Sequence, residues 1–513
     1  MATSPNDGVP GTIHILDLEH NMHTKHSGNG EIVLVPTPSA DPEDPLNWSP
    51  RRKMLSTICV NLYTFSVGLI ASVIASVLVP LSDATSTGYV FLLCGWGLLF
   101  WQPFALRYGK RLTYLVSIIG TIACLIWSPY ARSNGEWIAK CIVSGILAAP
   151  IEALPEVSVT DVYFTHERGL YMGFYCLSLS GSAYFSPVIS GFIADYAGWK
   201  WVFYVPAIWS GVVTVFLFFF MEETNYHRPS VGVVEISDSI ASEKGDEKEA
   251  TAAISTSSAT SKKTFLHKMS LWQTCPGDNP FKKSFLILRY LSWPVIFYAG
   301  FSYGSYLVWF NVMNATASII LGGAPYNFSD SMVGLSYISC CVGVIAAAFF
   351  TGSFSDWLTI KLARRNNGIM EAEHRLYPFA LTTILVPATL ILWGVGAAHN
   401  IHWFGLIVAM CLLAFSSTAG ITLSVNYLID SYHEISGDAM ATVIIVRNTM
   451  SFAIGYGITP WIDDMGYQNC FISAAFIGMA ACLVFAVMIK WGKFFRERSK
   501  ETYWTLAATN SHA

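Results

Sequence analysis

The chain has 513 residues, of which 53% are hydrophobic and only 12% are charged, and its formal net charge is −4. A soluble protein carries about 25% charged residues, so this chain cannot cover its surface unless lipid covers much of it. The small net charge gives no indication of nucleic-acid binding. The eleven cysteines form no CxxC or Cys/His cluster, which argues against a zinc site.

Twelve apolar runs are long enough to cross a bilayer, which takes roughly 20 residues per helix. They lie at 54–80, 88–106, 112–130, 137–163, 170–195 and 199–221, and then at 291–318, 332–357, 377–397, 402–428, 438–461 and 470–490. Residues 222–290 are rich in Ser, Thr, Ala and acids, which is typical of a disordered linker. Residues 1–53 and 491–513 are predicted to be tails, the first mostly disordered. The sequence thus predicts an all-α membrane protein with two six-helix bundles, 54–221 and 291–490.

The basic residues predict a topology for these runs. If the N-terminus is cytosolic, 26 of the 30 Lys and Arg residues fall in cytosolic segments, and the outer loops hold only Arg132 and Lys200. The remaining two, Lys140 and Arg447, lie inside apolar runs. Cytosolic loops of membrane proteins carry an excess of Lys and Arg, and one missed crossing would invert every later loop. We therefore expect both termini in the cytosol.

Several short strings stand at the ends or inside of the predicted helices. The segment after the second run reads QPFALRYGKR (102–111), and the eighth run ends in GSFSDW (352–357). Within the fifth run, SPVISG (186–191) contains Pro187 and Gly191. A proline bends a helix and a small residue lets a neighbouring helix approach closely. We expect Pro187 and Gly191 to form a helix-packing site.

These strings resemble the major facilitator superfamily, in which two six-helix halves are joined by a long cytosolic loop. The first string matches the family's G-x-L-A-D-R-x-G-R-R loop at Arg107, Gly109 and Arg111, with Leu106 in place of the aspartate. SPVISG is similar to the family's antiporter signature. The strings DPEDPLNWSPRRK (41–53), DVYFTHERG (161–169) and MEETNYHR (221–228) resemble the fungal drug:proton antiporters, and among them the branch related to the yeast histidinol and polyamine transporter.

The resemblance implies a latch between basic and acidic groups at the cytosolic helix ends, made and broken in each cycle. Its expected members are Arg107, Gly109, Arg111, Glu167 and Arg168 in the first half and Gly352 and Asp356 in the second. Because Leu106 cannot act as the acid, we expect Glu167 to supply a carboxylate near Arg107. The alternative is that these basic residues only fix the topology.

Two acids lie inside the fourth run, in GILAAPIEALPEV (145–157). Glu152 and Glu156 are four residues apart, so a continuous helix would place them one turn apart on one face. A charged side chain at the bilayer centre costs roughly 2.5–3.5 kcal/mol, and the cost falls when the carboxyl is protonated, faces water or meets a cation. We therefore interpret this pair as the proton-coupling site. The alternative is that both acids bond neighbouring helices throughout the cycle.

Arg447 is the other charge placed deep in the membrane, in the eleventh run. By depth, its expected partner is Asp430 at the cytosolic end of the tenth run, which predicts a structural ion pair within the membrane. An anion-binding site is the alternative.

Aromatic and amide side chains complete the candidate substrate site. The seventh and tenth runs border the central cavity in superfamily structures, and the expected ligands there are Tyr303, Tyr306, Trp309, Asn311, Asn426 and Tyr427. An acidic cavity walled with Tyr and Trp suits an organic cation, through charge and cation–π contacts. The alternative is ordinary packing or an interfacial aromatic belt.

The sequence thus predicts a monomeric, proton-coupled secondary transporter in the cell membrane that moves a small organic cation or amphipathic molecule by alternating access. It predicts no enzyme activity, no cofactor, no metal and no nucleic-acid partner. A non-transporting membrane receptor with the same fold is the alternative. Resemblance to drug antiporters favours efflux, whereas the polyamine branch favours uptake. The substrate, the choice between plasma and vacuolar membrane, and glycosylation of the sequon at Asn327 stay open.

Overall fold

The computed structural model describes residues 9–14, 44–73, 82–163, 165–225, 270, 272, 280–366 and 369–512. The helices of the first half are α1 (Pro50–Ser72), α2 (Ser82–Tyr108), α3 (Lys110–Trp127), α4 (Asn134–Ala148), α5 (Leu154–Val162), α6 (Thr165–Ala197) and α7 (Trp201–Phe220). Those of the second half are α10 (Pro294–Gly322), α11 (Asp330–Ser336), α12 (Ile338–Phe349), α13 (Ser355–Arg365), α14 (Phe379–Ala398), α15 (Trp403–Ser431), α16 (Ser436–Cys482) and α17 (Val484–His512).

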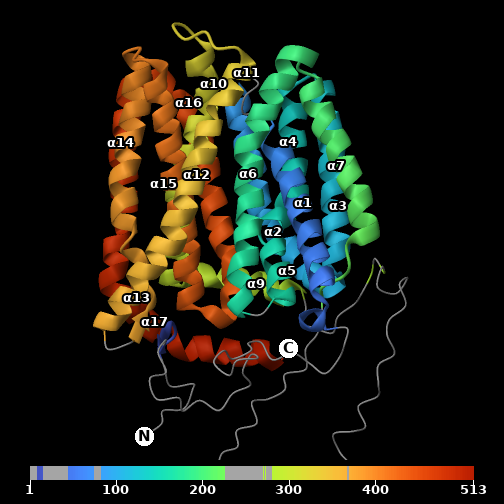
Figure 1. The fold of residues 1–513 in the computed structure, drawn as a ribbon, viewed down its shortest axis with the longest axis vertical. Coiled ribbons are helices and arrows are strands. Elements are labelled where there is room, and N and C mark those ends of the chain that lie inside the picture. The colour runs from blue at the N-terminus through green and yellow to red at the C-terminus, as the bar shows by residue number, and fades with distance from the viewer. Residues whose placement is uncertain are drawn as a thin grey trace, which may run out of the picture.

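The helices gather into two bundles that stand side by side, α1–α7 in one and α10–α16 in the other (Figure 1). Among the described residues, ten stretches are long and apolar enough to cross a membrane, and the bent pair of α9 (Pro280–Arg289) and α10 is one more. The last of the ten, Ser436–Leu506, reverses at Gly466 and so supplies a further crossing. The described part of the chain therefore contains the twelve crossings of the predicted fold.

Local chemistry sets where several helices begin and end. α1 begins at Pro50, whose fixed φ suits a first helical turn. The Ser133 hydroxyl accepts a hydrogen bond from the backbone N–H of Glu136 (3.2 Å) and caps α4. Gly466 has a φ of 71°, a conformation that glycine adopts without steric cost, and there the chain turns from the eleventh crossing into the twelfth.

Among the described residues, the two most extensive contacts between the halves involve α2 with α16 and α6 with α11. α2 packs along α16, where a Cβ added to Gly95 would lie 2.7 Å from the Cβ of Asn448, and the rings of Tyr89 and Phe452 are 5.2 Å apart. α6 packs against α11 only near its C-terminal end, where the backbone N–H of Ser331 donates to Asp195 (2.9 Å).

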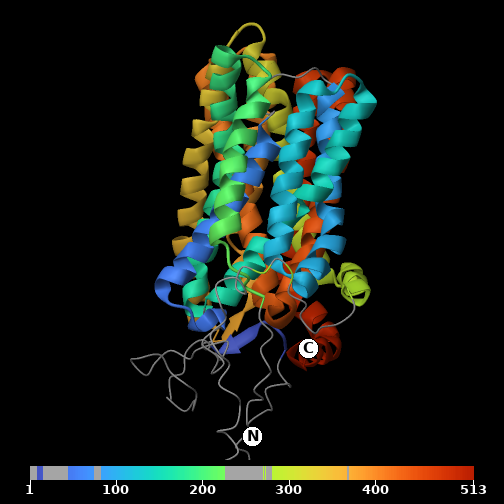
Figure 2. The same ribbon diagram turned by 90° about the vertical axis from the view of Figure 1, so that its right-hand side faces the viewer.

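One end of the bundle carries β1 (Thr12–His14), β2 (Ile369–Glu371), α9 (Pro280–Arg289) and α17, and we call it the terminal face (Figure 2). β1 pairs antiparallel with β2, with Thr12 opposite Glu371. The buried Arg496 of α17 donates to the carbonyl of Pro10 and pairs with Glu373. The α6–α11 contact lies near the other end, the opposite face.

These elements differ from the predicted tails and linker. Residues of the first tail form β1, the last residues of the predicted linker form α9, and the predicted second tail lies within α17. Of the other residues in the first tail and in 222–290, the structure describes 9–11, 44–53, 222–225, 270, 272 and 290. Three-residue strands and short helices that dock on a folded surface leave no periodic signal in the sequence, so composition alone suggested disorder.

Candidate functional site

The fourth crossing is broken at the predicted acids. α4 ends at Ala148, the 3-10 turn Ala149–Glu152 follows, and α5 begins at Leu154. Pro150 and Pro155 each stand in a first turn, where the missing N–H of proline is tolerated, whereas within a continuous helix each would remove a hydrogen bond. The expectation that Glu152 and Glu156 share the face of one continuous helix is therefore wrong, and Glu152 lies at the break itself.

Glu152 forms an ion pair with Arg447 of α16, and the two side chains are 11% and 6% exposed. Arg447 also donates to the hydroxyl of Tyr303 on α10, and its guanidinium carbon lies 4.6 Å from the centroid of that ring. The thiol of Cys94 on α2 donates to Glu152 (3.7 Å). Four crossings thus converge on one charged cluster between the two halves.

The predicted ion pair between Asp430 and Arg447 is wrong. Asp430 accepts instead from the Nε of Arg375 (2.8 Å), at the terminal face. Arg447 lies eleven residues into α16, which is about 16 Å along a helix from its first residue. Glu152 in the first half lies at a similar depth, so the ion pair of Arg447 forms with Glu152 across the boundary between the halves.

Glu156 lies on the first turn of α5 and is partly exposed. Among the described residues it has no ion-pair partner, in contrast to Glu152. Cys176 of α6 lies close enough to interact electrostatically with Glu156, and its side chain is exposed. Glu156 is thus an accessible acid. It lies beside the ion pair of Glu152 and Arg447, in which the two charges neutralise each other.

The predicted aromatic ligands divide into two groups. Tyr303 belongs to the cluster, but Tyr306, Trp309 and Tyr427 are buried within the second half. The Tyr306 hydroxyl bonds Thr382 of α14 (2.8 Å), Trp309 lies against Gly478, and Tyr427 lies against Gly492. The predicted stripe is therefore not formed, because Tyr303 faces the first half while Tyr306 and Trp309 pack against helices of their own half.

The two predicted amide ligands lie elsewhere. Asn426 is partly exposed on α15, eight residues beyond Thr418, which bonds Tyr184 of α6. Asn311 is also partly exposed, and its buried amide nitrogen has no hydrogen-bond partner among the described residues.

The basic and acidic groups at the terminal face form a similar pair in each half. Lys110, the first residue of α3, pairs with Asp161 near the end of α5. Arg375, just before α14, pairs with Asp430 near the end of α15 and with the predicted Asp356. Asp161 therefore supplies the acid that Leu106 lacks, a residue that sequence reasoning missed although its position before the helix end matches that of Asp430.

The other predicted latch residues surround these pairs. Arg107 lies over the ring of Tyr108 (5.7 Å), and Arg111 is buried and donates to the carbonyl of Phe218 (2.6 Å). Gly109 has a φ of 114°, which favours glycine. Gly352 lies in the π-helical turn Phe350–Phe354 that precedes α13. The side chains of Glu167 and Arg168 lie outside the described part of the chain, so the predicted contact of Glu167 with Arg107 stays a prediction.

Glu223 holds the start of α3 and was not foreseen from the sequence. Its two carboxylate oxygens accept the backbone N–H groups of Lys110 and Arg111, both at 3.0 Å. We expect Glu223→Ala to destabilise the first half by about 1–2 kcal/mol, because two N–H groups at a helix N-terminus lose their acceptor. Thermal unfolding of the purified protein would measure it, with Glu222→Ala as the neighbouring control, since Glu222 pairs with Arg52 instead. Equal stability of the two variants would contradict the assignment.

Pro187 and Gly191 lie where α6 meets α11. A Cβ added to Gly191 would lie 2.4 Å from the carbonyl oxygen of Asp330, and one added to Gly334 would lie 2.6 Å from that of Pro187. Two backbones approach so closely only where side chains are absent. This contact closes the opposite face between α6 and α11.

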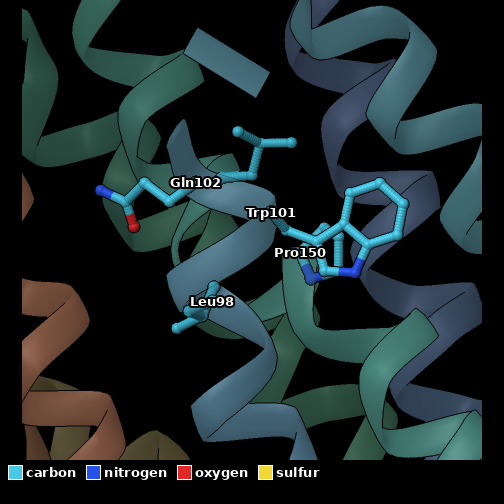
Figure 3. Close-up of a pocket in the computed structure, with 5 residues that line it drawn as sticks. Leu98, Trp101, Gln102 and Pro150 are labelled. Atoms are coloured by element: carbon cyan, nitrogen blue, oxygen red, sulfur yellow. The ribbon is translucent and has the colours of Figure 1, made fainter. Parts of the chain in front are cut away.

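A small hollow lies beside the break in the fourth crossing. It is lined by Leu98, Trp101, Gln102, Pro150 and Leu154, and it has no room for a water molecule (Figure 3). Ligand pockets usually measure about 300–1,000 Å³, so this hollow cannot hold an organic substrate. Trp101 and Gln102 point to different sides of α2, and Gln102 reaches the carbonyl of Gly437 in the other half (3.1 Å).

Two like bundles of six crossings that meet around a buried charged cluster define a membrane transporter. The family model of the Major Facilitator Superfamily matches residues 55–455, and the chain belongs to this family. The family is one of transporters, in agreement with the prediction that the chain is not an enzyme.

Individual relatives agree with this family. An MFS-type transporter of Schizosaccharomyces pombe is 29% identical over 550 residues, covering 97% of this chain and 94% of that one. Protein HOL1 of Saccharomyces cerevisiae is 25% identical and covers 97% of each chain. A solved D-xylose-proton symporter superposes with a TM-score of 0.57 over 84% of this chain and 96% of its own, at 13% identity, which bears on the fold alone.

Proposed function

We propose that this protein is a proton-coupled secondary transporter of a small organic cation, and that it works as a monomer by alternating access in the cell membrane. The observation that carries the proposal is Glu156, a partly exposed acid at mid-depth without an ion-pair partner among the described residues. A charged carboxylate at this depth is costly, so it binds either a proton or a cation. Because the two exclude each other, their exchange at Glu156 couples one flux to the other.

The distribution of basic side chains supports a cytosolic terminal face. Lys110, Arg111, Arg375, Lys493 and Arg496 all lie there, in or beside the ion pairs of both halves. Cytosolic segments of membrane proteins carry such an excess. The cell membrane and the monomeric state are part of the same proposal.

The contacts between the halves support access to Glu156 from the terminal face in this arrangement. The α6–α11 contact closes the opposite face, whereas Cys176 is exposed although it lies about 16 Å along α6 from Thr165. The reverse arrangement, open at the opposite face, completes an alternating-access cycle around a site at mid-depth.

The receptor alternative has no observation in its favour. The lack of an acid at Leu106 would favour a protein that has lost its transport cycle, but the Lys110–Asp161 pair provides a basic–acidic contact at that place.

The test is transport by the purified protein in vesicles with and without a pH gradient. Tetraethylammonium, 1-methyl-4-phenylpyridinium and spermidine serve as probe cations, each measured in both directions. We expect the gradient to accelerate transport of at least one probe, and Glu156→Gln to remove the effect of the gradient because the amide takes up no proton. Glu497→Gln, exposed on α17, is the matched control. Gradient-driven transport by Glu156→Gln at the wild-type rate would overturn the proposal.

A further inference from the structure

The ion pair between Glu152 and Arg447 connects the two halves of the molecule. Glu152 stands at the break of the fourth crossing in the first half, and Arg447 stands on α16 in the second. As long as Glu152 and Arg447 stay in contact, their ion pair holds the two halves in one relative position. Neutralising Glu152 removes the attraction and allows them to move.

Arg447 occupies the features that an organic cation would use. Its guanidinium pairs with a carboxylate and lies 4.6 Å from the centroid of the Tyr303 ring, within cation–π range. The hydroxyl of Tyr303 accepts a further hydrogen bond from it. The carboxylate of Glu152 and the ring face of Tyr303 could together bind an organic cation, but the Arg447 side chain of the protein itself occupies both.

Polar atoms around this pair lack partners in the present arrangement. Neither the amide nitrogen nor the amide oxygen of the fully buried Asn448 has a hydrogen-bond partner among the described residues, and the same holds for the Nε of Arg447 and the hydroxyl of Ser451. All three residues lie on α16, and Asn448 faces Gly95 of α2 in the other half. Buried polar groups in native structures are normally hydrogen-bonded, so these unpaired groups disfavour the present arrangement relative to one in which they find partners.

We propose that Arg447 is a resident counter-ion, a positioning residue whose pairing with Glu152 holds the opposite face closed until a proton or a cation neutralises Glu152. The proposal deepens the proposed function, because it names the device that ties the charge state of the site to the position of the halves. The titratable groups that face the pair are Cys94 on α2, Glu156 on α5, Tyr175 and Cys176 on α6, and Tyr303 on α10.

The experiment follows opening of the opposite face without any substrate, by hydrogen–deuterium exchange of the purified protein in nanodiscs. The reporters are the backbone amides of residues 187–197 and 329–336, corrected for intrinsic exchange. In the wild type we expect slow exchange of these amides, because the intact pair between Glu152 and Arg447 holds the opposite face closed.

The decisive variant is the double replacement Glu152→Gln with Arg447→Gln, which leaves no unpaired charge behind. We expect it to unfold at the wild-type temperature, yet to exchange roughly tenfold faster than the wild type at the opposite face, a shift in population of the same size. Arg447→Lys, which keeps the charge, should retain the slow exchange of the wild type.

Wild-type exchange in the double variant would overturn the proposal, since a merely structural pair loses nothing when both charges are removed. Uniformly faster exchange over the whole chain would also overturn it, because it reports global destabilisation. The result of this exchange experiment does not depend on the result of the transport test. A protein that moves none of the probe cations can still show this exchange pattern, and a transporter can lack it.

Discussion

Replacing Gly191 by valine should lower the rate of transport roughly 30- to 150-fold, through a cost of about 2–3 kcal/mol imposed on the arrangement closed at the opposite face. An added Cβ would lie 2.4 Å from the carbonyl oxygen of Asp330 and 3.0 Å from its carbonyl carbon. Both atoms belong to the backbone at the start of α11, which cannot rotate away as a side chain would. The halves would have to separate there to admit the valine.

The matched control is Gly211→Val in α7. An added Cβ at Gly211 meets nothing within 4 Å among the described residues, and the change in helix propensity is the same. The rate of transport is measured for whichever probe cation the wild type moves, and thermal unfolding checks that both variants fold. Gly191→Ala should give an intermediate rate. Wild-type transport by Gly191→Val would show that α6 and α11 do not meet so closely during the working cycle.

Much of the fold could be predicted because each crossing is specified locally. An apolar run of sufficient length crosses the membrane whatever its neighbours are, and the bias of Lys and Arg then fixes the direction of each run. The same local reasoning treated the fourth run as one continuous helix. It did not show that Pro150 and Pro155 divide this helix, since a proline in the first turn of a new helix and a proline in a kinked helix look the same in the sequence.

The partners of the buried charges could not be predicted in the same way. Arg447 was assigned to Asp430 because the two were expected at a similar depth in the membrane, whereas its partner Glu152 lies in the other half. Which side chains meet across two bundles depends on the rotation of each helix about its axis, and hydrophobic periodicity fixes that rotation only loosely. Tyr303 and Tyr306 show the same limit, since three residues of helix separate a side chain that faces the other half from one that packs against α14.

Replacing Arg496 by alanine should destabilise the terminal face of the second half by about 3–5 kcal/mol, the cost of removing one partner from a buried ion pair. The Arg496 side chain is fully buried, and two of its nitrogens bind the two carboxylate oxygens of Glu373, which is itself 4% exposed. A third nitrogen donates to the carbonyl of Pro10. The alanine variant would leave an unpaired carboxylate and an unpaired carbonyl in the interior.

The loss should spread through the elements that meet at this residue. Arg496 stands on α17, Glu373 follows β2, and Pro10 precedes β1, so one side chain holds three segments that are far apart in the sequence. Exposed Arg498 on the same helix gives the control variant Arg498→Ala, for which no change is expected. Thermal unfolding measures the overall loss, and hydrogen–deuterium exchange of residues 9–14, 369–376 and 484–506 shows whether the three segments loosen together.

A variant that lacks both charges distinguishes two quantities: the free-energy cost of leaving Glu373 unpaired, and the net contribution of the Arg496–Glu373 pair to stability. The double variant Arg496→Met with Glu373→Leu should recover most of the lost stability, because apolar side chains of similar volume often replace a buried ion pair at little or no cost. The hydrogen bond to Pro10 is lost in either case, so β1 should still exchange faster than in the wild type. If Arg496→Ala were as stable as Arg498→Ala, the pair would not be buried in solution, and α17 would not be docked on the terminal face.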